Sequence, residues 1–183
     1  MKKYIALLIM LAAFVVVIFH IKEKYHMSHP KGESPMHIQN RFEFDIDAPL
    51  KTAAPLFGPE GERTWGGDDW NPKFLHPQPA KDIRGAVFTV PHGHTQSIWV
   101  NTLFDLDAGR MQYVYFVPDY MVTLIDVQLT STSSDRTHVK VAYERTALKS
   151  EANDHVQKLG SHDAVAGPEW QKSITEYLQK QQK

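Results

Sequence analysis

The stretch MVTLIDVQLTSTSSDRTHVKVAYER, residues Met121–Arg145, alternates apolar and polar side chains in two runs that are separated by a polar turn. A period of two residues is typical of β-strands with one buried and one solvated face. The expected buried face of the first run carries Met121, Thr123, Ile125, Val127 and Leu129. In the second run, Val139, Val141 and Tyr143 oppose His138, Lys140 and Glu144. Because the connection STSSD has turn chemistry, the stretch predicts two antiparallel strands.

Upstream of this pair, the sequence predicts four more strands, because segments rich in Val, Ile, Thr and aromatic residues alternate with short turn-forming connectors. They are residues 41–47, 85–90, 95–104 and 110–117. After the first of them, Pro49 and Pro59 each favour the start of a short helix. The first short helix would reach Phe57, and the second would end before Gly66.

Downstream, Gly167 and Pro168 mark the start of a terminal helix. Its apolar stripe would consist of Trp170, Ile174, Tyr177 and Leu178, joined by Val165 if the helix runs through Pro168 with a kink. The expected fold is therefore α+β. A curved antiparallel sheet of six or seven strands would grip one long C-terminal helix, with two short helices after the first strand.

Three motifs carry a resemblance to a known family. They are Pro59–Arg63 followed by Trp65, the run Trp70–Phe74, and the run Tyr143–Leu148. In this order along residues 38–179, they make the chain similar to the START-like SRPBCC superfamily, also described as Bet v 1-like or polyketide cyclase/dehydrase-type. The likeness is strongest to its small bacterial members.

The resemblance implies a helix-grip fold with an internal cavity between the sheet and the terminal helix. Members of the superfamily bind lipids, sterols, polyketides or other apolar molecules there, and some catalyse cyclisation or dehydration. This chain departs from the pattern at Gly167-Pro168, which interrupts the terminal helix region, and in its hydrophobic N-terminus.

The composition excludes several classes of function. A formal net charge of -1 makes nucleic acid an unsuitable partner. With no cysteine among 183 residues, there is no thiolate nucleophile, no thiolate metal site and no disulfide framework. The sequence also lacks a Gly-x-Ser-x-Gly motif and a glycine-rich phosphate loop, so no cofactor is expected.

The N-terminus predicts a membrane partner. Lys2 and Lys3 precede the apolar run Ile5–Phe19, which lacks a small-x-small cleavage site after it. We expect residues 1–26 to form an uncleaved signal-anchor, residues 27–37 a linker, and residues 38–181 an extracytoplasmic domain. The alternative is a cleaved signal peptide and a secreted domain.

The segment GERTWGGDDWNP, residues 61–72, has no helical or strand period. Its two tryptophans can each bury on the order of 150–250 Å², while Gly66 and Gly67 allow a turn between them. Two interpretations are open: a clamp that fixes the loop to the core, or a portal whose tryptophans touch ligand.

The candidate cavity or portal residues combine this segment, the expected packed faces of the last two strands and the terminal helix, and two tyrosines of residues 110–117 whose direction strand phase alone does not settle. They are Trp65, Trp70, Tyr113, Tyr115, Thr123, Ile125, Val127, Tyr143, Trp170 and Ile174. The three tyrosines could equally be core residues whose hydroxyl groups have found a partner.

No metal site is predicted. His92 and His94 flank a turn, and His76 would be a third zinc ligand, but exposed loop histidines explain the pattern as well. Asp105 and Asp107 lack the further carboxylates of a dedicated calcium loop, so a hairpin turn is expected there.

The sequence thus favours a membrane-tethered domain that binds or carries an apolar or amphipathic small molecule. A cyclase or dehydratase that uses the same cavity is one alternative. A non-catalytic interaction protein of the cell envelope, with a filled core, is the other.

Overall fold

The computed structural model describes residues 34–92 and 95–181. Residues Met1–Ser34 and Pro35–Lys183 are separate units by their internal contacts. The expected signal-anchor and residues 27–33 of the expected linker lie outside the described residues. Within the described part of the chain, no helix is long and apolar enough to cross a membrane.

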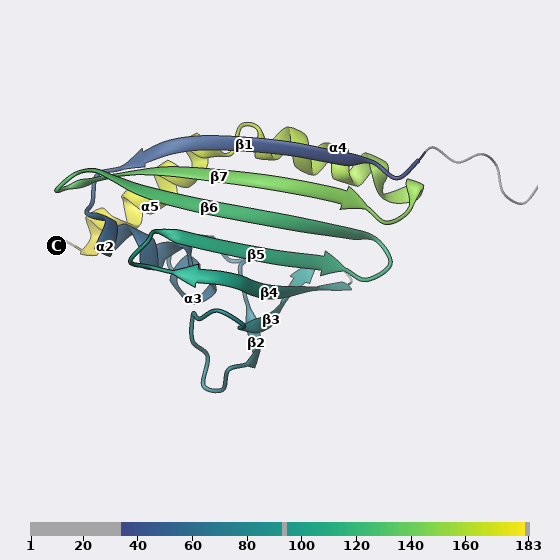
Figure 1. Ribbon diagram of the computed structural model, residues 1–183, viewed down its shortest axis with the longest axis horizontal. Coiled ribbons are helices and arrows are strands. Elements are labelled where there is room, and N and C mark those ends of the chain that lie inside the picture. Colours follow the sequence, from purple (N-terminus) through teal and green to yellow (C-terminus); the bar gives the residue numbers. More distant parts are fainter. Residues whose placement is uncertain (1–33, 93–94, 182–183) are drawn as a thin grey trace, which may run out of the picture. The chain divides into compact units, whose positions relative to one another are not determined.

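The second unit is built on a seven-stranded antiparallel sheet (Figure 1). Its strands are β1 (His37–Ile46), β2 (Lys73–His76), β3 (Val87–His92), β4 (Thr95–Asp105), β5 (Arg110–Val117), β6 (Met121–Ser133) and β7 (Arg136–Ala147), in the spatial order β1-β7-β6-β5-β4-β3-β2. The predicted meander is confirmed. The sequence analysis did not predict β2, because its four residues, of which only Phe74 is buried, are too few to show alternation. It also placed the next strand at residues 85–90, two residues before β3.

The predicted short helices follow β1 as α2 (Leu50–Ala53), η1 (Ala54–Phe57) and α3 (Pro59–Glu62). After β7 come η2 (Ser150–Ala152), α4 (Asn153–Asp163) and α5 (Gly167–Gln181). Both α4 and α5 lie against β1.

The idea of one kinked helix through Pro168 was wrong. The helices α4 and α5 are separate, and Val165 between them is 69% exposed rather than part of the apolar stripe. A proline in the first helical turn needs no hydrogen-bond acceptor, so Pro168 suits the start of α5. Two glycines let the pair approach β1 closely: a Cβ at Gly160 would lie 2.1 Å from Ile38 Cδ1, and one at Gly167 would lie 3.3 Å from the Glu43 carbonyl oxygen.

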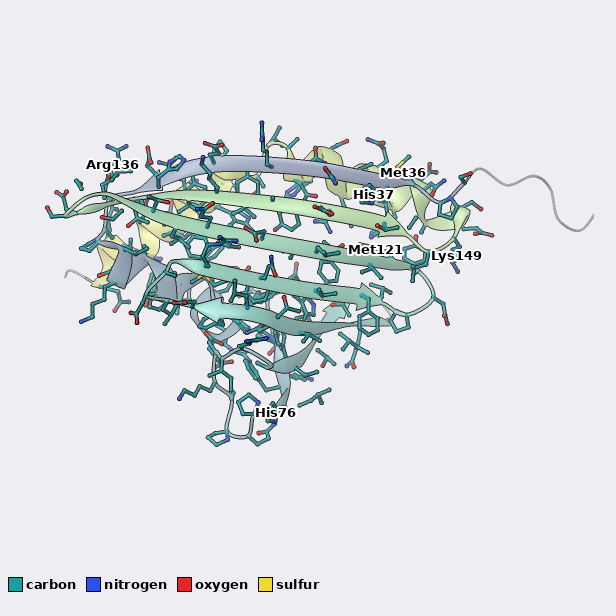
Figure 2. The ribbon with its side chains drawn as sticks, in the orientation of Figure 1. Met36, His37, His76, Met121, Arg136 and Lys149 are labelled. Carbon is teal, nitrogen blue, oxygen red and sulfur yellow. The ribbon has the colours of Figure 1, made fainter. Side chains whose placement is uncertain are left out.

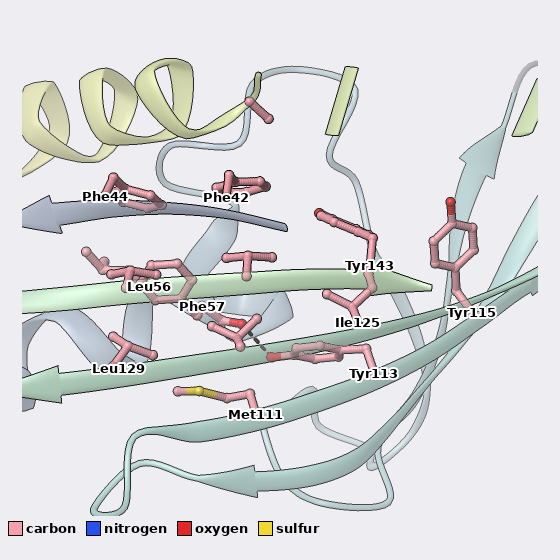
Figure 3. Close-up of a cluster of buried hydrophobic side chains, with 14 of the residues drawn as sticks. Phe42, Phe44, Leu56, Phe57, Met111, Tyr113, Tyr115, Ile125, Leu129 and Tyr143 are labelled. Carbon is pink, nitrogen blue, oxygen red and sulfur yellow. Dashed lines mark hydrogen bonds between the residues drawn. The ribbon is translucent and has the colours of Figure 1, made fainter. Parts of the chain in front are cut away.

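The main hydrophobic core fills the space between the packed face of the sheet and the helices (Figure 3). All five residues that the sequence assigned to the buried face of β6 are indeed buried. A second, smaller cluster forms under β2 and β3. It contains Phe74, Ala86, Phe88 and Val90, with Trp70, Ile83 and Trp99 packed against it.

Candidate ligand cavity

A small internal cavity of about 40 Å³ lies in the main core, where the sheet faces η1, α3 and α5. Six of its lining residues are aromatic, three are aliphatic and one is acidic. They are Phe57, Pro59, Glu62, Trp70, Trp99, Tyr113, Ile125, Val127, Tyr143 and Trp170. Ligand pockets of known proteins measure roughly 300–1,000 Å³, so the cavity admits only a small group unless its walls move.

The structure brings six of the ten predicted residues to this cavity: Trp70, Tyr113, Ile125, Val127, Tyr143 and Trp170. Tyr115 and Thr123 instead contact Arg145, and Ile174 is fully buried in the core. Trp65 borders a separate open groove of about 290 Å³ between the loop after α3 and α5.

Glu62 is the lining residue that sequence reasoning missed and that matters most for chemistry. Among the described residues, its carboxyl group receives no hydrogen bond and forms no ion pair. The Glu62 side chain is partly exposed to solvent, but protein atoms surround its carboxyl group closely and displace most of the water around it. Desolvation, with a smaller contribution from the negative charge of Asp82, raises the pKa of Glu62 to about 8.

The one-turn helix α3 holds Glu62 in place. The Asp82 carboxylate accepts hydrogen bonds from the backbone N–H of Glu60, at 3.0 and 3.1 Å, and from that of Gly61, at 3.3 Å. A carboxylate at this position satisfies N–H groups that have no partner within the helix. The Pro59–Arg63 motif is thus fixed from outside the segment by Asp82.

Gly61 is required because α3 packs directly on η1. A Cβ at Gly61 would lie 1.9 Å from the Pro55 carbonyl oxygen, a distance that no side chain tolerates. We therefore expect Gly61→Ala to lower the free energy of unfolding by about 1–3 kcal/mol, measured by urea denaturation. The exposed change Lys51→Ala should stay within about 0.5 kcal/mol. Equal stability of the two variants would contradict the close packing of α3.

The loop after α3 is tied back to the helices. Arg63 donates from Nε to Glu60 at 2.8 Å, from one terminal nitrogen to Asn71 at 3.2 Å, and from the other to the Pro72 carbonyl. The indole N–H of Trp65 donates to the Leu56 carbonyl at 2.8 Å. These bonds are the kind that a loop clamp makes.

Trp70 has features of both a loop clamp and a portal residue. Its indole N–H donates to the Pro59 carbonyl at 2.9 Å, and its ring lines the cavity. The ring also makes an edge contact with Trp99 at a centroid distance of 5.3 Å. On the other side of the cavity, Trp170 makes edge contacts with Trp65 at 5.1 Å and Phe42 at 5.2 Å.

The cavity tyrosines are neutral. Tyr113 donates its hydroxyl hydrogen to the Phe57 carbonyl, as a satisfied core tyrosine does (Figure 3). Desolvation raises the pKa of both Tyr113 and Tyr143 well above 10, and the negative charge of Glu62 contributes in both cases. In Figure 3 the Tyr115 ring stands apart from these two.

Arg145 anchors the sheet to the end of α4. Its Nε and a terminal nitrogen donate to the two Asp163 oxygens at 2.6 and 2.7 Å, and its other terminal nitrogen donates to the Tyr115 hydroxyl at 2.6 Å and to Thr123 at 3.2 Å. Its guanidinium carbon lies 4.6 Å from the centroid of the Tyr143 ring. Burial is the largest single influence and would lower the pKa of Arg145, but the hydrogen bonds to Asp163 and the electrostatic interactions with Tyr115, Asp163 and Tyr143 together outweigh it and raise the pKa.

The histidines do not form a metal site within the described part of the chain, where no three His, Cys, Asp or Glu side chains are placed to hold an ion. His94 lies outside the described residues. His76 is the last residue of β2, and Figure 2 shows it beside the segment that projects from this end of the sheet. Asp105 accepts a hydrogen bond from the Ala108 backbone N–H at 2.9 Å, as expected for a hairpin turn.

The fold is similar to several solved structures at low sequence identity. A point mutant of norcoclaurine synthase from Thalictrum flavum, in complex with a transition state analogue, has a TM-score of 0.60 and 12% identity, covering 82% of this chain and 99% of that one. The Mll3558 protein from Rhizobium loti has a TM-score of 0.55 and 15% identity, with 79% and 99% covered. CalU16 from Micromonospora echinospora has a TM-score of 0.53 and 11% identity, with 80% and 84% covered.

No family model and no curated protein matches the sequence. At identities this low, the solved structures establish the fold alone. The second unit therefore has the Bet v 1-like helix-grip fold, as the three sequence motifs implied.

Proposed function

We propose that this protein binds an apolar or amphipathic small molecule in the cavity between the sheet and α5. The carrying observation is the lining of that cavity, which combines six aromatic rings and three aliphatic side chains with a single carboxyl group. Known ligand sites have this character: mostly apolar walls with a few polar groups that orient the ligand.

Binding of anything larger than a small group requires the walls to move. The strands that form one wall are continuously paired, so the movable wall is the opposite one, which α3, its following loop and α5 provide. Trp70 and Trp170 stand on these elements and would move with them. Such opening of loops and helices commonly controls access to enclosed sites.

The proposal is tested by native mass spectrometry of residues 27–183, followed by organic extraction and identification of any bound molecule. We expect a stoichiometric apolar ligand, and we expect Val127→Phe, which fills the cavity, to lose it while still unfolding cooperatively. A ligand-free mass that does not change across a panel of lipids and polyketides would overturn the proposal and favour an interaction protein with a filled core.

A second candidate function is acid–base catalysis of a cyclisation or dehydration in the same cavity. Glu62 is the observation that favours it, because a carboxyl group with a pKa near the working pH can both donate and accept a proton. In that case Glu62→Gln would abolish turnover while the ligand still copurifies with the variant. A variant with unchanged turnover would exclude Glu62 as the acid–base group.

The proposal also includes attachment to a membrane by the hydrophobic N-terminal segment, with the folded unit on the extracytoplasmic side. Its support is the run Ile5–Phe19 behind two lysines. Fractionation of cells that express the full chain or a chain without residues 1–26 tests it. Both chains in the soluble fraction would contradict a tether.

A further inference from the structure

Among the described residues, the Glu62 carboxyl group is the one carboxylic acid that lines the cavity, and no cationic side chain lies beside it among the lining residues. Arg63, which follows Glu62 directly, is engaged with Glu60 at 2.8 Å on the exposed side of α3. Arg145, whose guanidinium lies over the ring of the lining residue Tyr143, is already paired with Asp163 at 2.6 Å. Within the described residues, no basic side chain lines the cavity. An ionised Glu62 would therefore need a positive partner from outside the part of the chain that the structure describes.

The walls around this carboxyl group suit a cation. Trp70, Trp99, Tyr143 and Trp170 line the same small space, and the electron-rich faces of such rings attract positive charge. The chain already uses this chemistry elsewhere: the Arg145 guanidinium lies over the Tyr143 ring, and the Lys149 ammonium lies over the Tyr120 ring. At about 40 Å³ the cavity accommodates a group the size of an ammonium ion before any wall moves.

We propose that the cavity selects amphipathic primary amines, whose ammonium head would pair with the Glu62 carboxylate and be enclosed by the tryptophan and tyrosine rings. This inference rests on the proposed ligand-binding function and specifies its ligand class. The apolar part of the amine would extend along the aromatic wall as α3 and α5 separate.

Binding of a cation must then compete with a proton on Glu62. The other titratable groups facing it are Asp82 beside α3, Tyr113 on β5 and Tyr143 on β7. Both tyrosines stay neutral below pH 10. Burial raises the pKa of Asp82, while the hydrogen bonds from the backbone N–H groups of α3 oppose this shift. A carboxyl group with a pKa of about 8 is roughly half ionised at pH 8 and about one hundredth ionised at pH 6. Amine affinity should thus fall by up to about 50-fold between these two pH values.

The test uses the full chain and its Glu62→Gln variant in one nonionic detergent, titrated with hexylammonium or with the neutral hexanol. Tryptophan fluorescence reports binding, because three tryptophans line the cavity. At pH 8 we expect hexylammonium to bind the wild type at least about tenfold more tightly than the variant. Hexanol should bind both proteins equally, which also verifies that the variant is folded. Partition into micelles cancels, since each probe is compared between two proteins in the same detergent.

The outcomes separate the two proposals. If both probes bind and Glu62→Gln changes neither affinity, the amine inference is overturned and the ligand-binding function stands. If neither probe binds, both are overturned. The pH dependence of the wild type needs no variant: an affinity for hexylammonium that is the same at pH 6 and pH 8 also overturns the inference.

Discussion

Replacing Asp163 by Asn should lower the free energy of unfolding by about 3–5 kcal/mol. The substitution removes the negative charge that faces Arg145, whose side chain is 6% exposed, and leaves the guanidinium buried beside neutral partners. Removing one member of a buried ion pair costs far more than the pair contributes, because the remaining charge stays desolvated. Urea denaturation followed by tryptophan fluorescence measures the loss.

Two further variants give this result its meaning. Glu176→Gln breaks a solvated pair with Lys172 at 3.9 Å and should cost less than about 0.5 kcal/mol. The double change Arg145→Met with Asp163→Leu removes both charges and should recover much of the stability lost in Asp163→Asn. A loss below about 1 kcal/mol for Asp163→Asn would show that water reaches the pair.

The second large effect is a dependence of stability on pH that Glu62 creates. Its pKa rises from 4.5 to about 8 on folding, so between these values the folded protein holds a proton that the unfolded chain has released. The free energy of unfolding therefore decreases as the pH rises from 4.5 to 8, by up to about 5 kcal/mol in total. Below pH 4.5 the contribution of Glu62 is fully present.

The Glu62→Gln variant isolates this contribution, because glutamine cannot ionise. Its unfolding free energy, measured by urea denaturation from pH 5 to pH 9, should lack the decrease that Glu62 causes. The variant should then be several kcal/mol more stable than the wild type at the alkaline end, relative to the difference at pH 5. The exposed change Glu176→Gln should reproduce the wild-type profile. Parallel profiles for wild type and Glu62→Gln would mean that the carboxyl group is solvated.

Together, these two experiments distinguish a buried ion pair that stabilises the fold, Arg145 with Asp163, from a carboxyl group that destabilises it, Glu62. The pair of Arg145 and Asp163 holds α4 to the sheet, and Arg145 also donates to Tyr115 and Thr123, two residues that were expected to face a ligand. Glu62 contributes nothing to packing that a glutamine could not supply, and its ionisation opposes folding. A group that destabilises the fold and has no partner within the described chain is characteristic of a functional site.

Residues 110–117 show what local sequence patterns can predict. The predicted strand agrees with β5 at both ends, because the alternation of its side chains and the turns beside it are local properties. The same reasoning assigned the buried face of β6 correctly, and it found the helix-grip order of elements. It failed at β2, where four residues carry too little pattern, and between α4 and α5, where close contact of Gly160 and Gly167 with β1 decides the path.

Local sequence patterns predicted only part of the cavity lining. Strand phase placed Ile125, Val127 and Tyr143 on the packed face, and each of them lines the cavity. For Tyr113, which also lines it, strand phase left the direction open. Strand phase also placed Thr123 on the packed face, but Arg145 takes up its hydroxyl group. Glu62 sits in a four-residue helix with no period to read, so the family motif that contains it was the single available signal.

The sequence by itself determined six of the seven strands, the buried faces of β6 and β7 and the class of the fold, since alternation, turn residues and helix starts act over a few neighbouring residues. Only the tertiary structure decided the size of the cavity, the isolation of the Glu62 carboxyl group and the pairing of Arg145 with Asp163. These depend on volumes and charges that distant segments bring together, and no short stretch of sequence records how closely such segments will approach.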